Sequence, residues 1–386
     1  MNLLETPNSK ILLVTETPPG TPNGFGVTLE CLFKETEHDV LFTDAAFNAH
    51  GKKNGYVLAQ VPYHRSIRHL LKFAWGYIPE WRNWYSKAWL RHNVRKSYRL
   101  VYAFVYSTDC LKYALWVAQS KDLKLIVHLA DHSEDFTTKE IRNLLNSCAG
   151  FVCITNEMAK KYENMLGRQD IEVLHNGAEN RCLDIPNPAI GPFNEKNPFI
   201  VCFLGGLFAH LHGDCIEDVV QAISQIRKTR PWVEFHLYGQ RQPSNFLEEI
   251  LQSDGCTHHG IIMPLEKKFD IMEKAHCFII PSSFNPASHK HYRYSFPTKL
   301  PELLASGRPI LSYGPFDTST NLLLNEDNLG IRVHKRSVKL LIDVLERIEA
   351  DYEQFCKDVT PNDPKIFEKY SATGVRKKIS RILSLI

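Results

Sequence analysis

Short apolar runs alternate with amphipathic segments along most of the chain, and this alternation occurs in two series. The first series comprises residues 10–15, 38–44, 100–106, 124–130 and 150–155. The second series comprises residues 199–207, 233–240, 275–283 and 308–314. Short apolar runs separated by segments with helical spacing are typical of buried parallel strands joined by helices. The sequence therefore predicts an α/β fold with two doubly wound domains.

A proline-rich stretch separates the two series. Residues 183–198 hold four prolines and little periodicity, which is typical of a linker. The length of 386 residues also exceeds what one hydrophobic core usually serves. We therefore predict an amino-terminal domain over residues 1–182 and a carboxy-terminal domain over 199–362. Because ligands of such sheets bind at the carboxyl ends of strands, two domains in tandem would offer a cleft between them.

Composition excludes several classes of protein. The chain is 44% hydrophobic and 23% charged with a net charge of +3, which is too weak to indicate a nucleic-acid partner. None of the ten cysteines forms a CxxC pair, and several, such as Cys202 and Cys277, lie inside apolar runs, which indicates reduced thiols. We see no secretory signal and no window near about 18 apolar residues. We therefore expect a cytoplasmic protein.

The stretch YRYSFPTKLPELLASGRPILSYGP, residues 292–315, predicts a short helix with an unusual beginning. Thr298 can cap a helix, and Pro301 is tolerated only in a first turn, so the helix should begin near 297–299. Exposed amides at such an end favour a phosphate, while Glu302 one turn inside can accept both hydroxyls of a ribose. This arrangement suits a nucleotide diphosphate. The alternative is an ordinary capped helix with a surface glutamate.

Several segments follow one another in a characteristic order. They are NGFGVTLECL, AGFVCITNEMAKKYENMLG, IEVLHNGAE with the pair Asn176-Gly177, FLGGL, AHCFIIPSSF and the stretch around Glu302. In order and spacing they resemble the GT-B glycosyltransferases, specifically the retaining GT4 family, or glycosyl transferases group 1. The resemblance implies a GT-B fold of two Rossmann-like domains facing each other across a cleft. It also implies that a last helix, 363–386, crosses back to the first domain.

By this resemblance the carboxy-terminal domain binds the diphosphate and ribose of a nucleotide-sugar. The implied donor-binding residues are Gly205, Gly206, Tyr294, Ser295, Phe296, Pro297, Thr298, Lys299, Leu300 and Glu302. Two features depart from the family pattern: Tyr294 replaces the first glutamate of the E-x7-E motif, and no Arg or Lys follows the glycine turn. We expect Arg241 or Arg293 to supply the missing charge. The alternative for each is a solvated surface cation.

The resemblance also places candidates in the amino-terminal domain. Asp131 and His132 follow the strand at 124–130, where relatives often contact the transferred sugar, so they are the candidate catalytic residues. If the strand persists, successive residues point to opposite faces, and only one of the two should point inward. The alternative is an aspartate that caps the next turn. A metal site that also includes His128 fits no strong zinc spacing, and the resemblance implies neither a metal nor another cofactor.

A glycine loop precedes the first predicted helix. Gly24, Phe25 and Gly26 would let backbone approach a ligand, so we assign them to the acceptor side. The alternative is a tight turn between strand and helix.

Residues 63–99 differ from the rest of the chain in composition. They carry nine Lys or Arg against one acid, and four tryptophans, at 75, 81, 84 and 89. Basic side chains among interfacial aromatics suit an anionic membrane surface. RNA binding and a helical pair that packs its tryptophans against the domain are the alternatives.

The sequence thus predicts an enzyme that transfers a sugar from a nucleotide diphosphate-sugar to an acceptor hydroxyl, with retention and without a metal. The expected acceptor is a glycan, a lipid-linked sugar or a polysaccharide, and the expected location is cytoplasmic, with peripheral contact at the inner face of the membrane. Two other functions stay open because of the departures from the family pattern. One is a non-catalytic GT-B scaffold that binds a nucleotide sugar or a partner enzyme. The other is a GT-B nucleotide-sugar epimerase.

Overall fold

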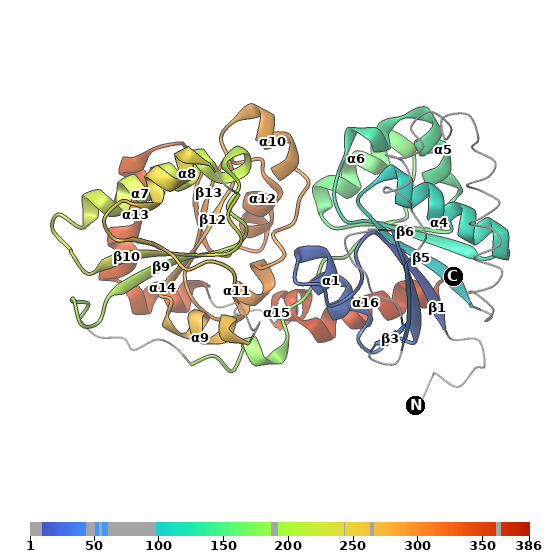
Figure 1. The fold of residues 1–386 in the computed structure, drawn as a ribbon, viewed down its shortest axis with the longest axis horizontal. Coiled ribbons are helices and arrows are strands. Elements are labelled where there is room, and N and C mark those ends of the chain that lie inside the picture. Colours follow the sequence, from blue (N-terminus) through green and yellow to red (C-terminus); the bar gives the residue numbers. More distant parts are fainter. Residues whose placement is uncertain are drawn as a thin grey trace. The chain divides into compact units, whose positions relative to one another are not determined.

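The computed structural model divides the chain into two compact units. Unit 1 comprises Met1–His175 and Arg376–Ile386, and unit 2 comprises Asn176–Val375. The structure describes residues 10–43, 51–53, 56–60, 98–186, 192–242, 244–262, 266–359 and 364–386. Each unit is built on one β-sheet with helices on its faces (Figure 1).

Unit 1 contains a sheet with the strand order β3-β4-β2-β1-β5-β6-β7-β8. The strands are β1 (Ile11–Thr15), β2 (His38–Phe42), β3 (Gly51–Lys53), β4 (Tyr56–Gln60), β5 (Leu100–Val105), β6 (Lys124–Leu129), β7 (Gly150–Cys153) and β8 (Ile171–Val173). Among the described strands of this sheet only β3, at its edge, pairs antiparallel, and its partner is β4. Because β1 lies between β2 and β5, the winding reverses there, and this switch point is where open α/β sheets bind ligands.

Three of the described helices of unit 1 begin at side-chain caps. The described helices are α1 (Gly24–Phe33), α4 (Thr108–Lys121), α5 (Lys139–Ser147), α6 (Asn156–Leu166) and the last helix, α16 (Ala372–Ser384), which belongs to unit 1 from Arg376 onward. Asn23, Ser107 and Thr155 each accept a hydrogen bond from the amide three residues on, which satisfies a free donor of α1, α4 and α6. Figure 1 shows α4, α5 and α6 on one side of the sheet and α1 and α16 on the other.

Unit 2 contains a wholly parallel sheet with the strand order β11-β10-β9-β12-β13-β14. The strands are β9 (Phe199–Leu204), β10 (Val233–Tyr238), β11 (Cys256–His258), β12 (Cys277–Pro281), β13 (Ile310–Tyr313) and β14 (Ile331–Val333). This order is that of a Rossmann-type sheet, and its switch point lies between β9 and β12. The apolar runs of the central strands form the core, and β12 is buried at every position.

The helices of unit 2 cover both faces of its sheet. They are α7 (Ala209–Ile226), α8 (Asn245–Leu251), α9 (Lys267–Lys274), α10 (Pro286–Tyr292), α11 (Leu300–Ala305), α12 (Ser319–Glu326), α13 (Val338–Ala350), α14 (Tyr352–Val359) and α15 (Pro364–Tyr370). In Figure 1, α7, α8 and α13 lie together on one side of the sheet, and α9 and α11 lie on the other. The predicted fold class is thereby confirmed.

The units divide seven residues earlier than the predicted boundary after residue 182. The reason is that residues just after 175 already form hydrogen bonds within unit 2. Asn176 donates to the carbonyl of Thr298, and the amide of Ala178 donates to the carbonyl of Tyr370. The predicted helix 363–386 is two helices, α15 and α16, and its residues 376–386 belong to unit 1.

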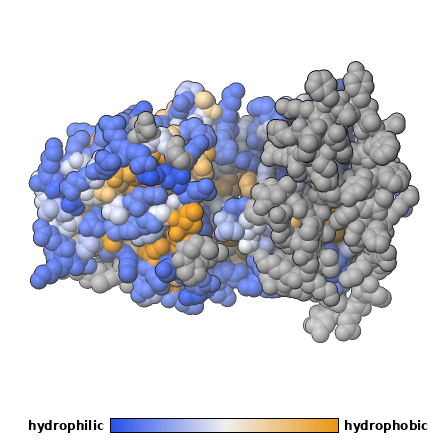
Figure 2. Space-filling model, in the orientation of Figure 1, coloured by the Kyte–Doolittle hydropathy of each residue, from blue (hydrophilic) through white to orange (hydrophobic). Residues whose placement is uncertain are grey.

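Two sequence predictions concern membranes. No helix in the described ranges is long and apolar enough to cross a membrane. Residues 63–97 of the basic, tryptophan-rich stretch lie outside the described residues. On the face shown in Figure 2, the coloured surface is mainly hydrophilic with small hydrophobic patches.

Candidate active site

A glycine turn ends β9 at the switch point of unit 2. The amide of Gly205 donates to the carbonyl of Tyr238 at 2.9 Å, so this turn lies against the end of β10. Gly239 has a φ of 147°, and a Cβ there would lie 1.8 Å from the carbonyl oxygen of Gly205. A Cβ at Gly206 would lie 2.4 Å from the Phe208 ring. The turn that carries two predicted donor residues is therefore shaped by close backbone packing that only glycine permits.

We expect Gly239→Ala to lower the free energy of unfolding of unit 2 by about 2 kcal/mol, because the new methyl group meets a backbone atom at a strained φ. Gly260 provides the control, since its φ is also positive, at 77°, but nothing lies within 4 Å of a Cβ there. Gly260→Ala should cost about 1 kcal/mol. Urea unfolding gives the free energy of unfolding of both variants. Equal losses of stability in Gly239→Ala and Gly260→Ala would contradict the packing argument.

A short helix that sequence analysis missed, α10, follows β12 and borders the same switch point. Asn285 caps it, and Pro286 occupies its first turn, a combination that was visible in the sequence. The hydroxyl of Tyr292 donates to the carbonyl of Leu211 at 3.0 Å and lies 2.6 Å from Nδ1 of His212. These contacts fix α10 against the first turn of α7.

The predicted donor segment runs from α10 to α11. Its beginning is held in place because the hydroxyl of Ser295 donates to the carbonyl of His291 at 2.9 Å. Phe296 and Leu300 are buried, whereas the three residues between them are half-buried. The tip formed by 297–299 is therefore not sealed beneath neighbouring side chains.

The beginning of α11 differs from the expected one. The helix begins at Leu300, with Lys299 at its N-cap and no side-chain cap. The prediction that Thr298 caps the helix is wrong. Its carbonyl oxygen instead accepts a hydrogen bond from Nδ2 of Asn176 at 2.7 Å.

Glu302, the predicted ribose acceptor, is only 6% exposed. Its Oε1 accepts from Nζ of Lys268 at 2.6 Å, and its Oε2 lies 3.8 Å from Nζ of Lys299. Burial and the charge of Glu302 raise the pKa of the neighbouring Cys182 to about 12. Two ammonium groups therefore lie beside this buried carboxylate, and of the two lysines only Lys268 was not predicted from the sequence.

The two arginines proposed to replace the missing cations lie in different places. Arg241 lies beside the glycine turn, because its neighbours Gln240 and Gln242 bond to Leu207, but its guanidinium pairs with Glu248 at 2.7 Å. Arg293 is exposed, and its guanidinium carbon lies 6.0 Å from the centre of the Tyr294 ring. Of the two arginines, Arg293 directly precedes Tyr294 in the predicted donor segment, whereas Arg241 lies outside this segment.

His212 does not supply the missing charge. Burial, and then the neighbouring imidazoles of His291 and His210, lower its pKa to about 4. The side chain is therefore neutral at pH 7. Its Nδ1 forms a hydrogen bond with the hydroxyl of Tyr292.

In unit 1 the candidate catalytic pair follows β6. Nδ1 of His132 lies 3.1 Å from the hydroxyl of Tyr162, and its Nε2 lies 2.7 Å from Nζ of Lys161. Burial, and then the charge of Lys161, lower the pKa of His132. Oδ1 of Asp131 accepts from the amide of His132 at 2.8 Å. His132 is thus a neutral side chain bonded to α6, while Asp131 is half-buried.

The predicted glycine loop is part of a helix. Gly24, Phe25 and Gly26 form the first turn of α1, because Oδ1 of Asn23 accepts from the amide of Gly26 at 2.8 Å and starts the helix there. The assignment of these residues to a loop is wrong. The Phe25 ring stacks on Tyr106 with centroids 4.3 Å apart, so an aromatic pair lies at the switch point of unit 1.

A buried acid that was not predicted from the sequence, Glu16, lies at the same switch point. Its Oε1 accepts from the amides of Tyr106 and Ser107, at 3.1 and 2.7 Å, and from the hydroxyl of Ser107 at 2.7 Å. Its Oε2 is buried without a hydrogen-bond partner in the described part of the chain. Burial raises the pKa of Glu16 to about 7 despite these donors. The only sequence signal was its position directly after β1.

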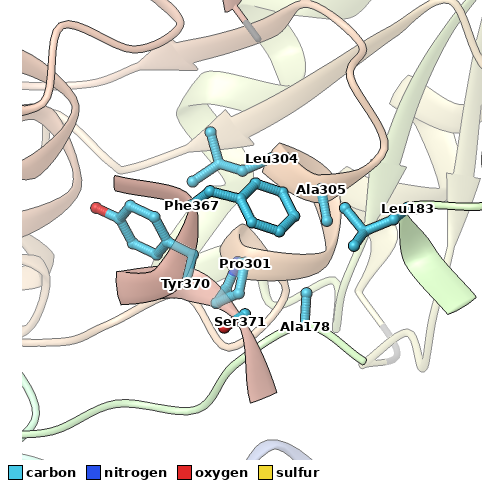
Figure 3. Close-up of a pocket in the computed structure, with 8 residues that line it drawn as sticks. All are labelled: Ala178, Leu183, Pro301, Leu304, Ala305, Phe367, Tyr370 and Ser371. Carbon is cyan, nitrogen blue, oxygen red and sulfur yellow. The ribbon is translucent and has the colours of Figure 1, made fainter. Parts of the chain in front are cut away.

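Two further observations bound the chemistry of the site. Among the described residues, no group of three or more His, Cys, Asp or Glu could hold a metal ion. An apolar pocket lies behind α11 (Figure 3), lined by Ala178, Leu183, Pro301, Leu304, Ala305, Phe367, Tyr370 and Ser371. Glu302 does not line it, so this pocket supports the helix rather than holding the predicted ribose.

Comparison with known proteins agrees with this geometry. Residues 198–351, most of unit 2, match the family model described as glycosyl transferases group 1. No curated protein matches the sequence. Among solved structures, Anabaena Alr3699/HepE in complex with UDP and glucose is 15% identical, with a TM-score of 0.68 over 98% of this chain and 100% of that chain.

Two other similar structures are glycosyltransferases. The enzyme from Rickettsia africae ESF-5 is 11% identical, with a TM-score of 0.66 over 98% of both chains. WaaG, a glycosyltransferase involved in lipopolysaccharide biosynthesis, is 12% identical, with a TM-score of 0.60 over 97% of this chain and 98% of that chain. The chain therefore has the GT-B fold of these structures, and its residues 198–351 are similar to the glycosyl transferases group 1.

Proposed function

We propose that the chain transfers a sugar from a uridine diphosphate sugar to a hydroxyl of a glycan, lipid-linked or polysaccharide acceptor. The observation that carries this proposal is the buried Glu302 one turn inside α11, behind a tip at 297–299 that stays partly open. A carboxylate held in this way can accept the ribose hydroxyls, and the backbone of the tip can hold the diphosphate. Uridine is the first base to test, because HepE was solved with UDP and with UDP-glucose.

The proposed chemistry retains the anomeric configuration and uses neither a metal nor another cofactor. The departing diphosphate gains negative charge in the transition state, so donors fixed in advance around it would speed the reaction. Backbone amides of 296–300 and the cation of Arg293 are the proposed donors. Asp131 is the proposed contact with the transferred sugar, because its side chain is half-buried while His132 is bonded to α6.

We make two proposals for how the acceptor is bound, and both concern unit 1. The switch point of unit 1, with the ring pair of Phe25 and Tyr106, is the proposed acceptor site. Residues 63–99 are the proposed contact with an anionic membrane at the cytoplasmic face, and this stays a prediction. Sedimentation with anionic vesicles at low salt tests it, and an absence of binding would contradict it.

A thermal-shift titration tests the donor proposal. UDP at about 100 times its dissociation constant should stabilise the protein by about 2.7 kcal/mol. Replacing Glu302 by glutamine should weaken UDP about 10-fold, because a charged acceptor of the ribose hydroxyls is lost.

The matched ligand is UDP that lacks both ribose hydroxyls. It should bind the wild type and Glu302→Gln equally well, because nothing remains for the carboxylate to accept. If Glu302→Gln lost the same affinity for both ligands, Glu302 would not act through the ribose hydroxyls. A wild type that binds no nucleotide would refute the proposal.

The non-catalytic scaffold remains the second candidate. Tyr294 in place of a glutamate and the lack of an Arg or Lys directly after the glycine turn favour it. Release of UDP from a panel of UDP-sugars, with and without acceptor sugars, decides between the candidates. Binding without release supports the scaffold, and donor consumption without an acceptor supports an epimerase.

A further inference from the structure

Asn176 lies where the chain enters unit 2, and the proposed function assigns it no role. Its side chain is buried, being 2% exposed, and its Nδ2 donates to the carbonyl oxygen of Thr298 at 2.7 Å. Thr298 belongs to the turn that leads into α11 and Glu302. One hydrogen bond therefore joins the first residue of unit 2 to a segment 122 residues further along the chain.

The backbone that carries Asn176 is itself held in place. The amide of Ala178 donates to the carbonyl of Tyr370, and the amide of Ala372 donates to the carbonyl of Ala178, both at 2.7 Å. A Cβ at Gly177 would lie 2.5 Å from the carbonyl of Ser371, so only glycine permits this approach. Figure 3 shows Ala178 and Ser371 on the same side of the pocket behind α11. Asn176 thus projects from fixed backbone.

The turn that Asn176 contacts leads into a helix that no side chain caps. Helix α11 has six residues and no side-chain cap, and Pro301 in its first turn has no amide hydrogen. The described backbone bonds at its start are Leu300 to Pro297 at 2.8 Å and Leu303 to Lys299 at 3.0 Å. A binding segment has to be held to within about 0.5 Å, and a buried amide bonded to its backbone provides such support.

We propose that Asn176 is a positioning residue for the segment Phe296–Leu300. Its amide holds the carbonyl of Thr298 and so sets the direction of the neighbouring backbone amides and of Glu302 toward a nucleoside diphosphate. The nature of the ligand rests on the proposed function. The anchoring of the segment does not, so the two are tested separately.

The test compares wild type with Asn176→Asp, which keeps the shape of the side chain but removes the donor and places a carboxylate oxygen against a carbonyl. Calorimetric titration with UDP should show about 10-fold weaker binding to the variant. Hydrogen exchange without nucleotide should show faster exchange at the amides of Leu300 and Leu303, with no change in β9. A purely global loss of stability would not give this local pattern.

Asn321→Asp is the matched control. Asn321 is 1% exposed, and its Nδ2 donates to the carbonyls of Gly314 and Pro315 at 3.0 and 2.8 Å, so it loses the same kind of bond in the same unit. The control should bind UDP within about twofold of the wild type. Equal weakening in both variants would overturn the proposal, because the effect would then be general.

The other possible results separate the positioning role of Asn176 from the proposed function. Wild-type affinity in Asn176→Asp would overturn the positioning role while leaving the proposed function intact. If wild type binds no UDP, the proposed function fails, and exchange at Leu300 alone decides the anchoring: faster exchange supports it, and unchanged exchange overturns it. Should Asn176→Asp not fold, Asn176→Ala removes the donor without adding a charge, and the same two measurements apply.

Discussion

Replacing Arg308 by methionine is expected to lower the free energy of unfolding of unit 2 by about 4 kcal/mol. Arg308 is fully buried, and its guanidinium donates to backbone carbonyls from three separate segments. These carbonyls belong to Ala275 at 3.1 Å, Ser306 at 2.6 Å, Pro186 at 2.6 Å and Glu273 at 3.2 Å. Methionine fills part of the volume but leaves the carbonyls without donors, and each loss costs about 1–3 kcal/mol.

The measurement is urea unfolding followed by circular dichroism. Arg347→Met is the control, because Arg347 is exposed on α13 and its guanidinium carbon lies 6.0 Å from the centre of the Phe355 ring. It should change stability by no more than about 0.5 kcal/mol. Arg308→Lys should fall between the two, because an ammonium group cannot reach all four carbonyls. A loss below about 1 kcal/mol for Arg308→Met would contradict the assignment of Arg308 as the link between these segments.

Replacing Glu16 by glutamine is expected to stabilise unit 1 by about 3 kcal/mol at pH 8 and by no more than about 1 kcal/mol at pH 5. Burial raises the pKa of Glu16 from 4.5 in the unfolded chain to about 7 in the folded one. Between these values the unfolded state loses its proton while the folded state keeps it, so stability falls as the pH rises from 4.5 to about 7. Glutamine has no proton to lose, and its carbonyl can still accept from Tyr106 and Ser107.

Urea unfolding of wild type and Glu16→Gln at pH 5 and at pH 8 gives the difference in the free energy of unfolding at each pH. The control is Glu140→Gln in the same unit, because that carboxylate is 72% exposed and should respond by no more than about 0.5 kcal/mol at either pH. A stabilisation by Glu16→Gln that does not depend on pH would show that Glu16 is not protonated in the folded state. A buried acid that costs this much stability at a switch point is typical of a functional site, where stability and activity are in tension.

The fold could be predicted because its signals are local. Burial of both faces of a strand requires a continuous apolar run, and the runs that begin at Ile11, Leu100 and Phe199 became the central strands β1, β5 and β9. The strands that were missed, such as β8 and β14, have only three residues each, too few to show a period. Helix α10 was not predicted although Asn285-Pro286 marks its beginning, because its seven residues are too few to show a helical period.

The candidate site could be predicted only in part. Glu302 and the segment before it were identified from spacing along the chain, which is a local property. Lys268, which pairs with Glu302, was not identified, because it lies 34 residues away and meets Glu302 only when α9 packs near α11. The same reason hid the bond from Asn176 to Thr298.

By itself, therefore, the sequence determined two doubly wound domains and the short helix that carries Glu302, since apolar periodicity and prolines act over a few residues. Only the tertiary structure decided which polar groups lose contact with water. Glu16 follows a strand like many exposed acids, and Arg308 precedes one like many exposed bases, yet both are buried by elements distant in sequence. Desolvation depends on everything that surrounds a group in space, and that information is absent from its immediate neighbours along the chain.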